Sequence, residues 1–114
     1  MSPGEVVWVW FPFSHTEANP YKRRPVVVIN STGSGADQAV LVAMVTSNAR
    51  RAAHPGVFDI PIENWQAIGL VSASVVRINR IWTAENRDLA GSLGGSVSAA
   101  TLQAIKAGLT ALIG

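Results

Sequence analysis

Short apolar runs separated by turn-forming residues fill most of the chain from Glu5 to Trp82. They are rich in valine, isoleucine and aromatic residues, which favour strands. The first run has almost no polar interruption, which predicts a strand covered on one face by the core and on the other by a second subunit. The pattern predicts strands over Glu5–Phe11, Val26–Asn30, Ala39–Thr46 and Val57–Ile60, and a last strand region made of Leu70–Arg77 and Ile78–Trp82.

The C-terminal segment has a different period. Gly94 and Gly95 loosen the chain, and Ser98 is a good N-cap for a helix that begins after it. Apolar side chains then recur at helical spacing: Leu102, Ile105, Leu109, Leu112 and Ile113. The segments between the predicted strands favour loops and turns over these ranges: Ser14–Lys22, Ser31–Asp37, Asn48–Pro55 and, with one helical turn at Trp65, Ile62–Gly69.

These elements predict a mainly β fold of the α+β class. About five short strands and one terminal helix, without strand–helix–strand alternation, favour a small β-barrel with a C-terminal α-helix. At 114 residues the chain forms a single domain, residues 1–114. Only 14% of the residues are charged and 48% are hydrophobic, so we expect a homodimer or a tight complex that covers apolar surface.

Composition excludes several classes of site. The chain has no cysteine, which removes disulfide scaffolds, thiolate zinc sites and cysteine nucleophiles and fits a reducing cytoplasm. Its start carries no basic region, and no apolar run is long enough to span a bilayer. We therefore expect a cytoplasmic protein without a membrane segment. His15 and His54 lack metal-ligand spacing to each other or to a carboxylate, so no metal and no cofactor is expected.

The basic residues are clustered, whereas the acidic residues are scattered singly. The net charge is +2 and the pI about 9.7, which alone is a mild signal. The clusters lie beside the ends of predicted strands, where a small barrel can hold a site rigidly and open it to solvent. Guanidinium, hydroxyl and amide groups together suit a phosphodiester, so the distribution favours a polyanion such as RNA. The clustered residues are Lys22, Arg23, Arg24, Arg50, Arg51, Arg77 and Arg80.

Arg24 and Thr46 are the leading candidates for chemistry. Arg24 precedes Pro25, which restricts its backbone to an extended form and fixes where its side chain leaves the strand. Its alternative role is that of an ordinary surface arginine. Thr46 and Ser47 end an apolar strand, where their hydroxyls would bond a phosphate or ribose oxygen or simply cap the next turn.

Arg77 interrupts an apolar run, so its guanidinium must turn outward or find a partner. A functional role and a structural ion pair are both open for it. Tyr21 and the tryptophans could stack on RNA bases; Tyr21, in a polar loop, is the better candidate, whereas Trp8 and Trp10 are interpreted as core and interface residues. The predicted RNA-binding residues are Tyr21, Lys22, Arg23, Ser47, Asn48, Arg50, Arg51 and Asn79.

The order and spacing of these segments resemble the MazF/PemK family of toxin endoribonucleases. The resemblance runs over nearly the whole chain and rests on no single motif. Its parts are Gly4-Glu5-Val6-Val7-Trp8-Val9, Arg24-Pro25 before a valine-rich strand, Val45-Thr46-Ser47, Gly69-Leu70, Val75-Val76-Arg77, Trp82-Thr83 and the helix end Ala111-Leu112-Ile113-Gly114.

The resemblance implies an SH3-like barrel with a C-terminal helix and a homodimer. It implies the toxin of a type II toxin–antitoxin system, with a cognate antitoxin that occupies the RNA groove. It also implies metal-independent, sequence-selective cleavage of single-stranded RNA, in which the 2′-hydroxyl attacks to leave a 2′,3′-cyclic phosphate and a 5′-hydroxyl. Carried over to matching positions, Arg24 and Thr46 are the catalytic pair, and Arg77 matches an arginine that PemK-type members use as a proton donor.

One position departs from the PemK-type pattern. Two residues after that arginine those members place an aspartate as general base, and here the residue is Asn79, whose amide cannot accept a proton. Either Arg24 and Thr46 carry the chemistry, or the protein cleaves poorly and mainly binds RNA or antitoxin. Two further alternatives are a gyrase-poisoning toxin of the same barrel type, which relies on a C-terminal tryptophan absent from Leu109–Gly114, and a peptide-binding SH3-like module, for which no aromatic groove is evident.

Overall fold

The computed structural model describes residues 1–11 and 22–114. Its strands are β1 (Glu5–Phe11), β2 (Lys22–Thr32), β3 (Ala39–Thr46), β4 (Asp59–Pro61), β5 (Val75–Glu85) and β6 (Leu89–Ser96). Its α-helices are α1 (Ala49–Ala53), α2 (Trp65–Ile68) and α3 (Ala99–Ile113), and its 3-10 turns are η1 (Gly35–Asp37) and η2 (Asn86–Asp88).

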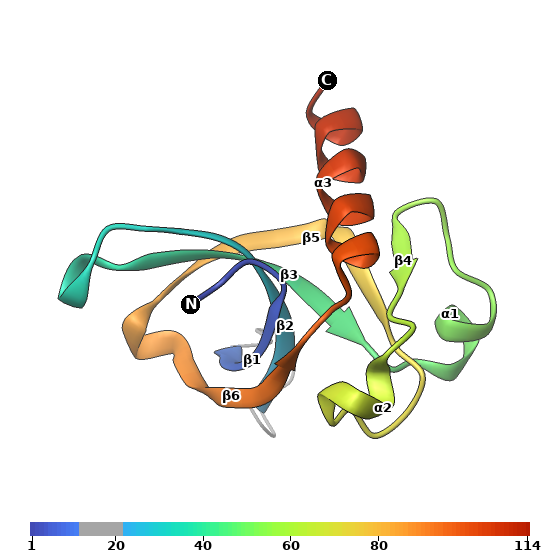
Figure 1. Cartoon of the computed structure of the whole chain (residues 1–114), viewed down its shortest axis with the longest axis horizontal. Coiled ribbons are helices and arrows are strands. Elements are labelled where there is room, and N and C mark those ends of the chain that lie inside the picture. The colour runs from blue at the N-terminus through green and yellow to red at the C-terminus, as the bar shows by residue number, and fades with distance from the viewer. Residues whose placement is uncertain (12–21) are drawn as a thin grey trace.

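The described strands form one antiparallel sheet in the order β4-β5-β3-β2-β1-β6. The sheet curls, and α3 stands against it with its C-terminal end projecting clear of the strands (Figure 1). The predicted mainly β fold with a C-terminal helix is confirmed. The sheet does not close on itself, because β4 and β6 remain its two edges, so the architecture is barrel-like only in a loose sense. Within the described residues, no helix combines the length and the apolar composition that a membrane crossing requires.

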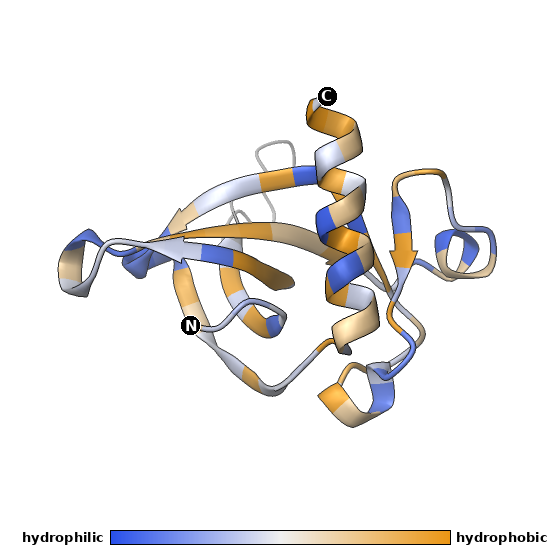
Figure 2. Cartoon of the chain, turned by 45° about the horizontal axis from the view of Figure 1, so that its top comes forward, coloured by the Kyte–Doolittle hydropathy of each residue, from blue (hydrophilic) through white to orange (hydrophobic). Residues whose placement is uncertain are grey.

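A buried core lies on each face of the central strands. Apolar residues run along the central strands, and α3 alternates apolar and polar residues around its axis (Figure 2). Val6 contributes to the core under α3, whereas Val7 and Val9 belong to a second core on the other face. The predicted two-faced burial of β1 is present at Val6, Val7 and Val9, where this chain covers both faces itself, whereas Trp8 is only half-buried. Beyond that point Trp10 is exposed.

The terminal helix forms as predicted, although its apolar stripe is longer than the surface it covers. The hydroxyl oxygen of Ser98 accepts a hydrogen bond from the backbone N–H of Thr101 at 3.1 Å. Gly108 allows close packing, because a Cβ there would lie 2.5 Å from the side chain of Ile78. The predicted stripe is wrong at its end: Leu112 and Ile113 are exposed, since the last turn extends past the sheet.

Several predicted boundaries are also wrong. The loop assigned to Asn48–Pro55 contains α1, and the last strand region starts at Val75 rather than Leu70 and continues to Glu85. The segment that includes Gly94 and Gly95 is not loose chain but part of β6. Gly95 is required there, because a Cβ would lie 2.9 Å from the Cα of Ile68 in α2. Gly95 allows α2 to pack on this edge strand, and the glycines of β6 at the same time weaken the strand pattern in the sequence.

Candidate functional site

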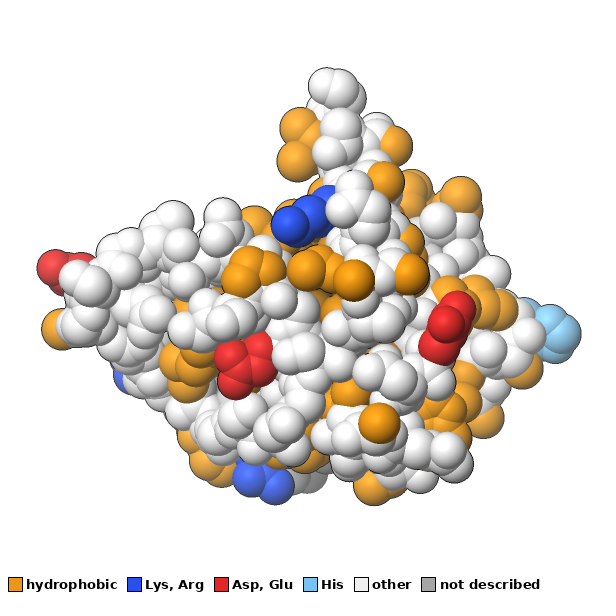
Figure 3. Space-filling model, in the orientation of Figure 1, with side chains coloured by type: hydrophobic (Ala, Val, Ile, Leu, Met, Phe, Trp, Pro, Cys, Tyr) orange, Lys and Arg blue, Asp and Glu red, His pale blue; other side chains and the backbone are white. Residues whose placement is uncertain are grey.

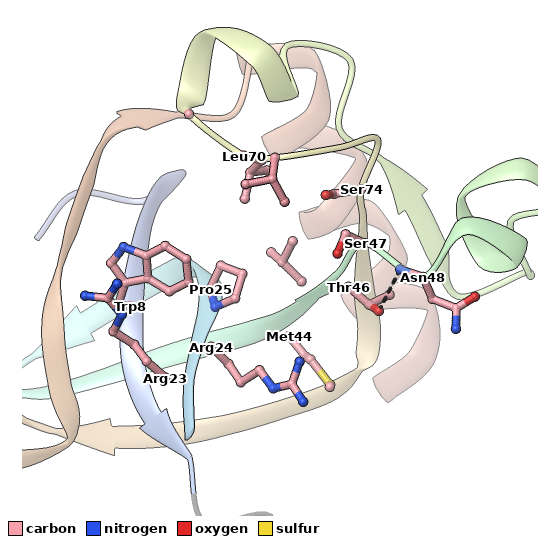
Figure 4. Close-up of a pocket in the computed structure, with 13 residues that line it drawn as sticks. Trp8, Arg23, Arg24, Pro25, Met44, Thr46, Ser47, Asn48, Leu70 and Ser74 are labelled. Atoms are coloured by element: carbon pink, nitrogen blue, oxygen red, sulfur yellow. Dashed lines mark hydrogen bonds between the residues drawn. The ribbon is translucent and has the colours of Figure 1, made fainter. Parts of the chain in front are cut away.

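A hollow of about 450 Å³ opens where the start of β2 lies beside the end of β3 (Figure 4). The antiparallel pairing of these strands, with Val26 opposite Met44, brings the residues before Val26 close to those after Met44. We call this cavity the hollow and define it by its lining residues. They are Trp8, Arg23, Arg24, Pro25, Met44, Val45, Thr46, Ser47, Asn48, Gly69, Leu70, Val71 and Ser74.

Arg24 enters the hollow from β2. Its backbone pairs with Val9 of β1, and Pro25 follows it as a wall residue. Its side chain is half-buried and lies alongside Met44 (Figure 4). A guanidinium that is held on a strand and partly shielded from water is well suited to bind a phosphate.

The end of β3 holds Thr46, Ser47 and Asn48 on the opposite side of the hollow (Figure 4). The hydroxyl oxygen of Thr46 accepts a hydrogen bond from the backbone N–H of Asn48 at 3.3 Å. The side-chain oxygen of Asn48 in turn accepts from the backbone N–H of Arg51 at 3.1 Å and caps α1. Thr46 therefore does cap a turn, and its own hydroxyl hydrogen remains able to point at a ligand. The structure thus brings Arg24 and Thr46 into one cavity.

The sequence did not predict the contribution of Trp8 or of the segment before β5. Trp8 lines the hollow, half-buried, with the guanidinium of Arg23 4.4 Å from its ring centroid. Leu70 and Val71 form an apolar rim. One signal for Trp8 was present in the sequence: because side chains alternate along a strand, Trp8 lies on the face opposite Val7 and Val9. In the structure Trp8 pairs with Pro25, which places it beside Arg24.

A second charged group lies outside the lining of the hollow. The carboxylate of Asp59, only 2% exposed, accepts hydrogen bonds from Arg51 at 3.0 Å and from the backbone N–H of Gly56 at 2.8 Å. Arg77 lies on the same carboxylate, with its Nε 3.6 Å from Oδ1. Burial would raise the pKa of Asp59, but these hydrogen bonds and the two arginine charges together hold that pKa below its ordinary 3.8.

The arrangement separates the predicted site residues into groups. Arg23, Arg24, Thr46, Ser47 and Asn48 line the hollow. Arg51 and Arg77 form ion pairs with Asp59, so the structural alternative raised for Arg77 is present. Arg50 and Asn79 are exposed and do not line the hollow. The side chain of Lys22, and the whole of Tyr21 and His15, lie outside the described residues.

Charge clusters suited to a metal ion are absent from residues 1–11 and 22–114: nowhere in these ranges do three histidine, aspartate or glutamate side chains come together.

The fold resembles the crystal structure of MazF (Form-I) from Deinococcus radiodurans, with a TM-score of 0.68 at 19% sequence identity. The similarity covers 99% of this chain and 96% of that one.

Residues 2–113 match the PemK-like, MazF-like toxins of type II toxin–antitoxin systems. The chain belongs to this family. Among its relatives, Endoribonuclease MazF2 of Mycobacterium bovis is 35% identical over 94 residues, which cover 81% of this chain and 79% of the relative. Endoribonuclease MazF6 of Mycobacterium tuberculosis matches to the same extent. The family resemblance inferred from the sequence is therefore confirmed.

Proposed function

We propose that this toxin is an endoribonuclease that cuts single-stranded RNA in the hollow, at preferred sequences and without a metal ion. The observation that carries the proposal is that Arg24 and Thr46 line one cavity from two neighbouring strands. The relatives named as endoribonucleases support the same activity.

The proposed reaction begins with attack of a ribose 2′-hydroxyl on the adjacent phosphorus. A new P–O2′ bond forms while the P–O5′ bond breaks; the proton of the 2′-hydroxyl passes to water and the departing 5′-oxygen takes up a proton, which leaves a 2′,3′-cyclic phosphate and a 5′-hydroxyl. Arg24 stabilises the negative charge that builds on the phosphate oxygens, and Thr46 donates a hydrogen bond to the same group. An arginine stays protonated, so Arg24 acts as a charge stabiliser or an acid rather than as a base.

Cleavage in the presence of a chelator tests this proposal. The purified protein is incubated with a long RNA in EDTA, and the cut ends are mapped and their termini identified. We expect a limited set of cuts that end in a cyclic phosphate and a 5′-hydroxyl. An RNA that remains intact in EDTA but is cut when a divalent cation is restored would contradict the metal-independent mechanism.

The lining of the hollow within the described residues includes no carboxylate and no imidazole. Catalysis by these described residues alone would rest on charge stabilisation and on in-line positioning of the sugar. This observation and Asn79 favour, as a second candidate, a family member that binds RNA or antitoxin and cleaves it only slowly.

Asn79→Asp distinguishes a catalytic site at Arg24 and Thr46 from one at Arg77. Asn79 is exposed in the β5 bulge, where Ile78–Arg80 have no partner in β3 because Met44 pairs with Arg77 and Ala43 with Ile81. If Arg24 and Thr46 carry the chemistry, this surface change should alter the cleavage rate by no more than about twofold. A large gain in rate would instead place the limiting base beside Arg77.

We also propose a homodimer. Because this chain itself covers both faces of β1 at Val6, Val7 and Val9, a second subunit would contact apolar side chains elsewhere, and some exposed hydrophobic side chains lie around α3 (Figure 3). Val57, before β4, is 88% exposed, and Ile113, at the end of α3, is 80% exposed. Light scattering at micromolar concentration should give twice the chain mass of 12.0 kDa, and a clean monomer would contradict the proposal.

The family implies an antitoxin partner, and we propose that it competes with RNA for the face that carries Lys22, Arg23, Arg24, Arg50 and Arg51. Of these arginines, Arg23 and Arg50 are exposed, whereas Arg51 is already paired with Asp59. An acidic antitoxin segment that is disordered when free would fit these two positions and fold as it binds.

A further inference from the structure

The ring of Trp8 is the largest aromatic surface in the hollow. Its neighbours along β1, Val7 and Val9, are completely buried, whereas Trp8 is only half-buried. The face of its indole is covered by the guanidinium of Arg23, 4.4 Å from the ring centroid, and Arg23 itself is exposed. Among the described residues, Trp8 therefore carries a ring face that is covered by an exposed side chain.

The surroundings of the ring fit a flat ligand with a polar edge. Leu70 and Val71 form the rim, and Val71 is 92% exposed, which leaves an apolar side chain uncovered beside the cavity. On the side opposite Trp8, Ser47 and Ser74 present hydroxyl groups (Figure 4). Ser74 is buried, and its hydroxyl donates a hydrogen bond to the carbonyl of Ser72 at 2.9 Å, so toward a ligand its oxygen can act only as an acceptor.

We propose that one base of the RNA stacks on Trp8 in place of the guanidinium of Arg23, which moves to a neighbouring phosphate. The proposal rests on the proposed function, because it names the subsite that positions the RNA for Arg24 and Thr46. An exposed contact between a guanidinium and an indole is weak, whereas a base stacked on an aromatic ring contributes more. The exchange is therefore favourable, and it brings a second arginine next to Arg24 when RNA is bound.

The volume of the cavity limits what it can accept. At about 450 Å³ the hollow lies in the lower part of the range for small-ligand sites, which suits one nucleotide rather than a run of stacked bases. Every base has a flat π face, so stacking on Trp8 should tolerate different bases at this position. An abasic residue at the same position should not be tolerated.

The test uses an oligoribonucleotide that contains a mapped cut site and a 2′-deoxyribose at the cut, so that it binds without being cleaved. A series of these oligonucleotides each carries one abasic residue, and affinity is measured by fluorescence anisotropy. For the parent protein we expect one abasic position to lower affinity by about tenfold to a hundredfold. Trp8→Leu should lower affinity for the intact oligonucleotide by a similar factor and show no further loss at that abasic position.

Trp10→Leu is the matched control, since Trp10 lies on the same strand, is more exposed and does not line the hollow. It should bind the whole series as the parent does. Trp8→Phe retains an aromatic ring and should still lose affinity at that abasic position, though by a smaller factor. It replaces Trp8→Leu in the test if thermal unfolding shows that Trp8→Leu is unfolded. Strict additivity of the Trp8 and abasic effects would overturn the stacking proposal. If the parent protein binds and cuts RNA and Trp8→Leu binds equally well, only the stacking proposal is overturned. If the parent protein neither binds nor cuts RNA, the proposed function is overturned as well.

Discussion

Replacing Arg24 with alanine should lower the RNA cleavage rate by about a hundredfold to a thousandfold while leaving the fold intact. The loss of a preorganised charge at a developing oxyanion typically raises the barrier by about 3–4 kcal/mol. Arg24 fits this role because its backbone is restricted by Pro25, its side chain is half-buried, and Thr46 lines the same hollow. The rate should be measured on an RNA that contains a mapped cut site, with thermal unfolding of the same sample.

Two further variants sharpen this test. Arg24→Lys keeps a positive charge but loses the planar guanidinium, so its cleavage rate should lie between those of the parent and of Arg24→Ala. Arg87→Ala is the control, since that arginine forms an exposed pair with Glu85 and does not line the hollow. If Arg24→Ala cuts RNA as fast as the parent protein, the hollow is not the catalytic site.

That Arg24 and Thr46 lie at the same site could be predicted from the sequence. Arg24 stands before a valine-rich run, and Thr46 ends the next apolar run along the chain. Two consecutive strands joined by a turn usually pair antiparallel, so the start of the first meets the end of the second. The structure has this hairpin, with Val26 opposite Met44. Local pattern and short-range topology were sufficient here.

The remaining parts of the site depend on contacts that local pattern does not encode. Trp8 continues an apolar run and looked like a core residue, because the sequence does not show that the sheet curls away and leaves its ring at a cavity wall. β6 was not predicted because its glycines, of which Gly95 allows α2 to approach, weaken the strand pattern. The position of Arg77 depends on β4, a strand of three residues whose Asp59 lies directly opposite it.

That buried carboxylate should contribute a large part of the stability of this region. Breaking a buried ion pair by removing one partner costs about 3–5 kcal/mol. Arg51 is 39% exposed and can turn to water, so for Asp59→Ala we expect the lower end, about 3 kcal/mol, or a fall in Tm on the order of 10 °C. The exposed Glu63 provides the control, because Glu63→Ala should change the free energy of unfolding by about 0.5 kcal/mol or less.

The pH dependence of this contribution has a defined sign. The pKa of Asp59 in the folded protein lies below its ordinary value of 3.8, because the N–H of Gly56 and the charges of Arg51 and Arg77 outweigh the effect of burial. At a pH below that value the unfolded chain binds a proton that the folded protein does not, so stability falls as the pH falls. The difference in free energy of unfolding between the parent and Asp59→Asn should be constant above the ordinary value of 3.8 and should shrink below it. Chemical denaturation at a series of pH values measures this difference, and a constant difference down to about pH 2 would mean that the carboxylate charge is not what stabilises the group.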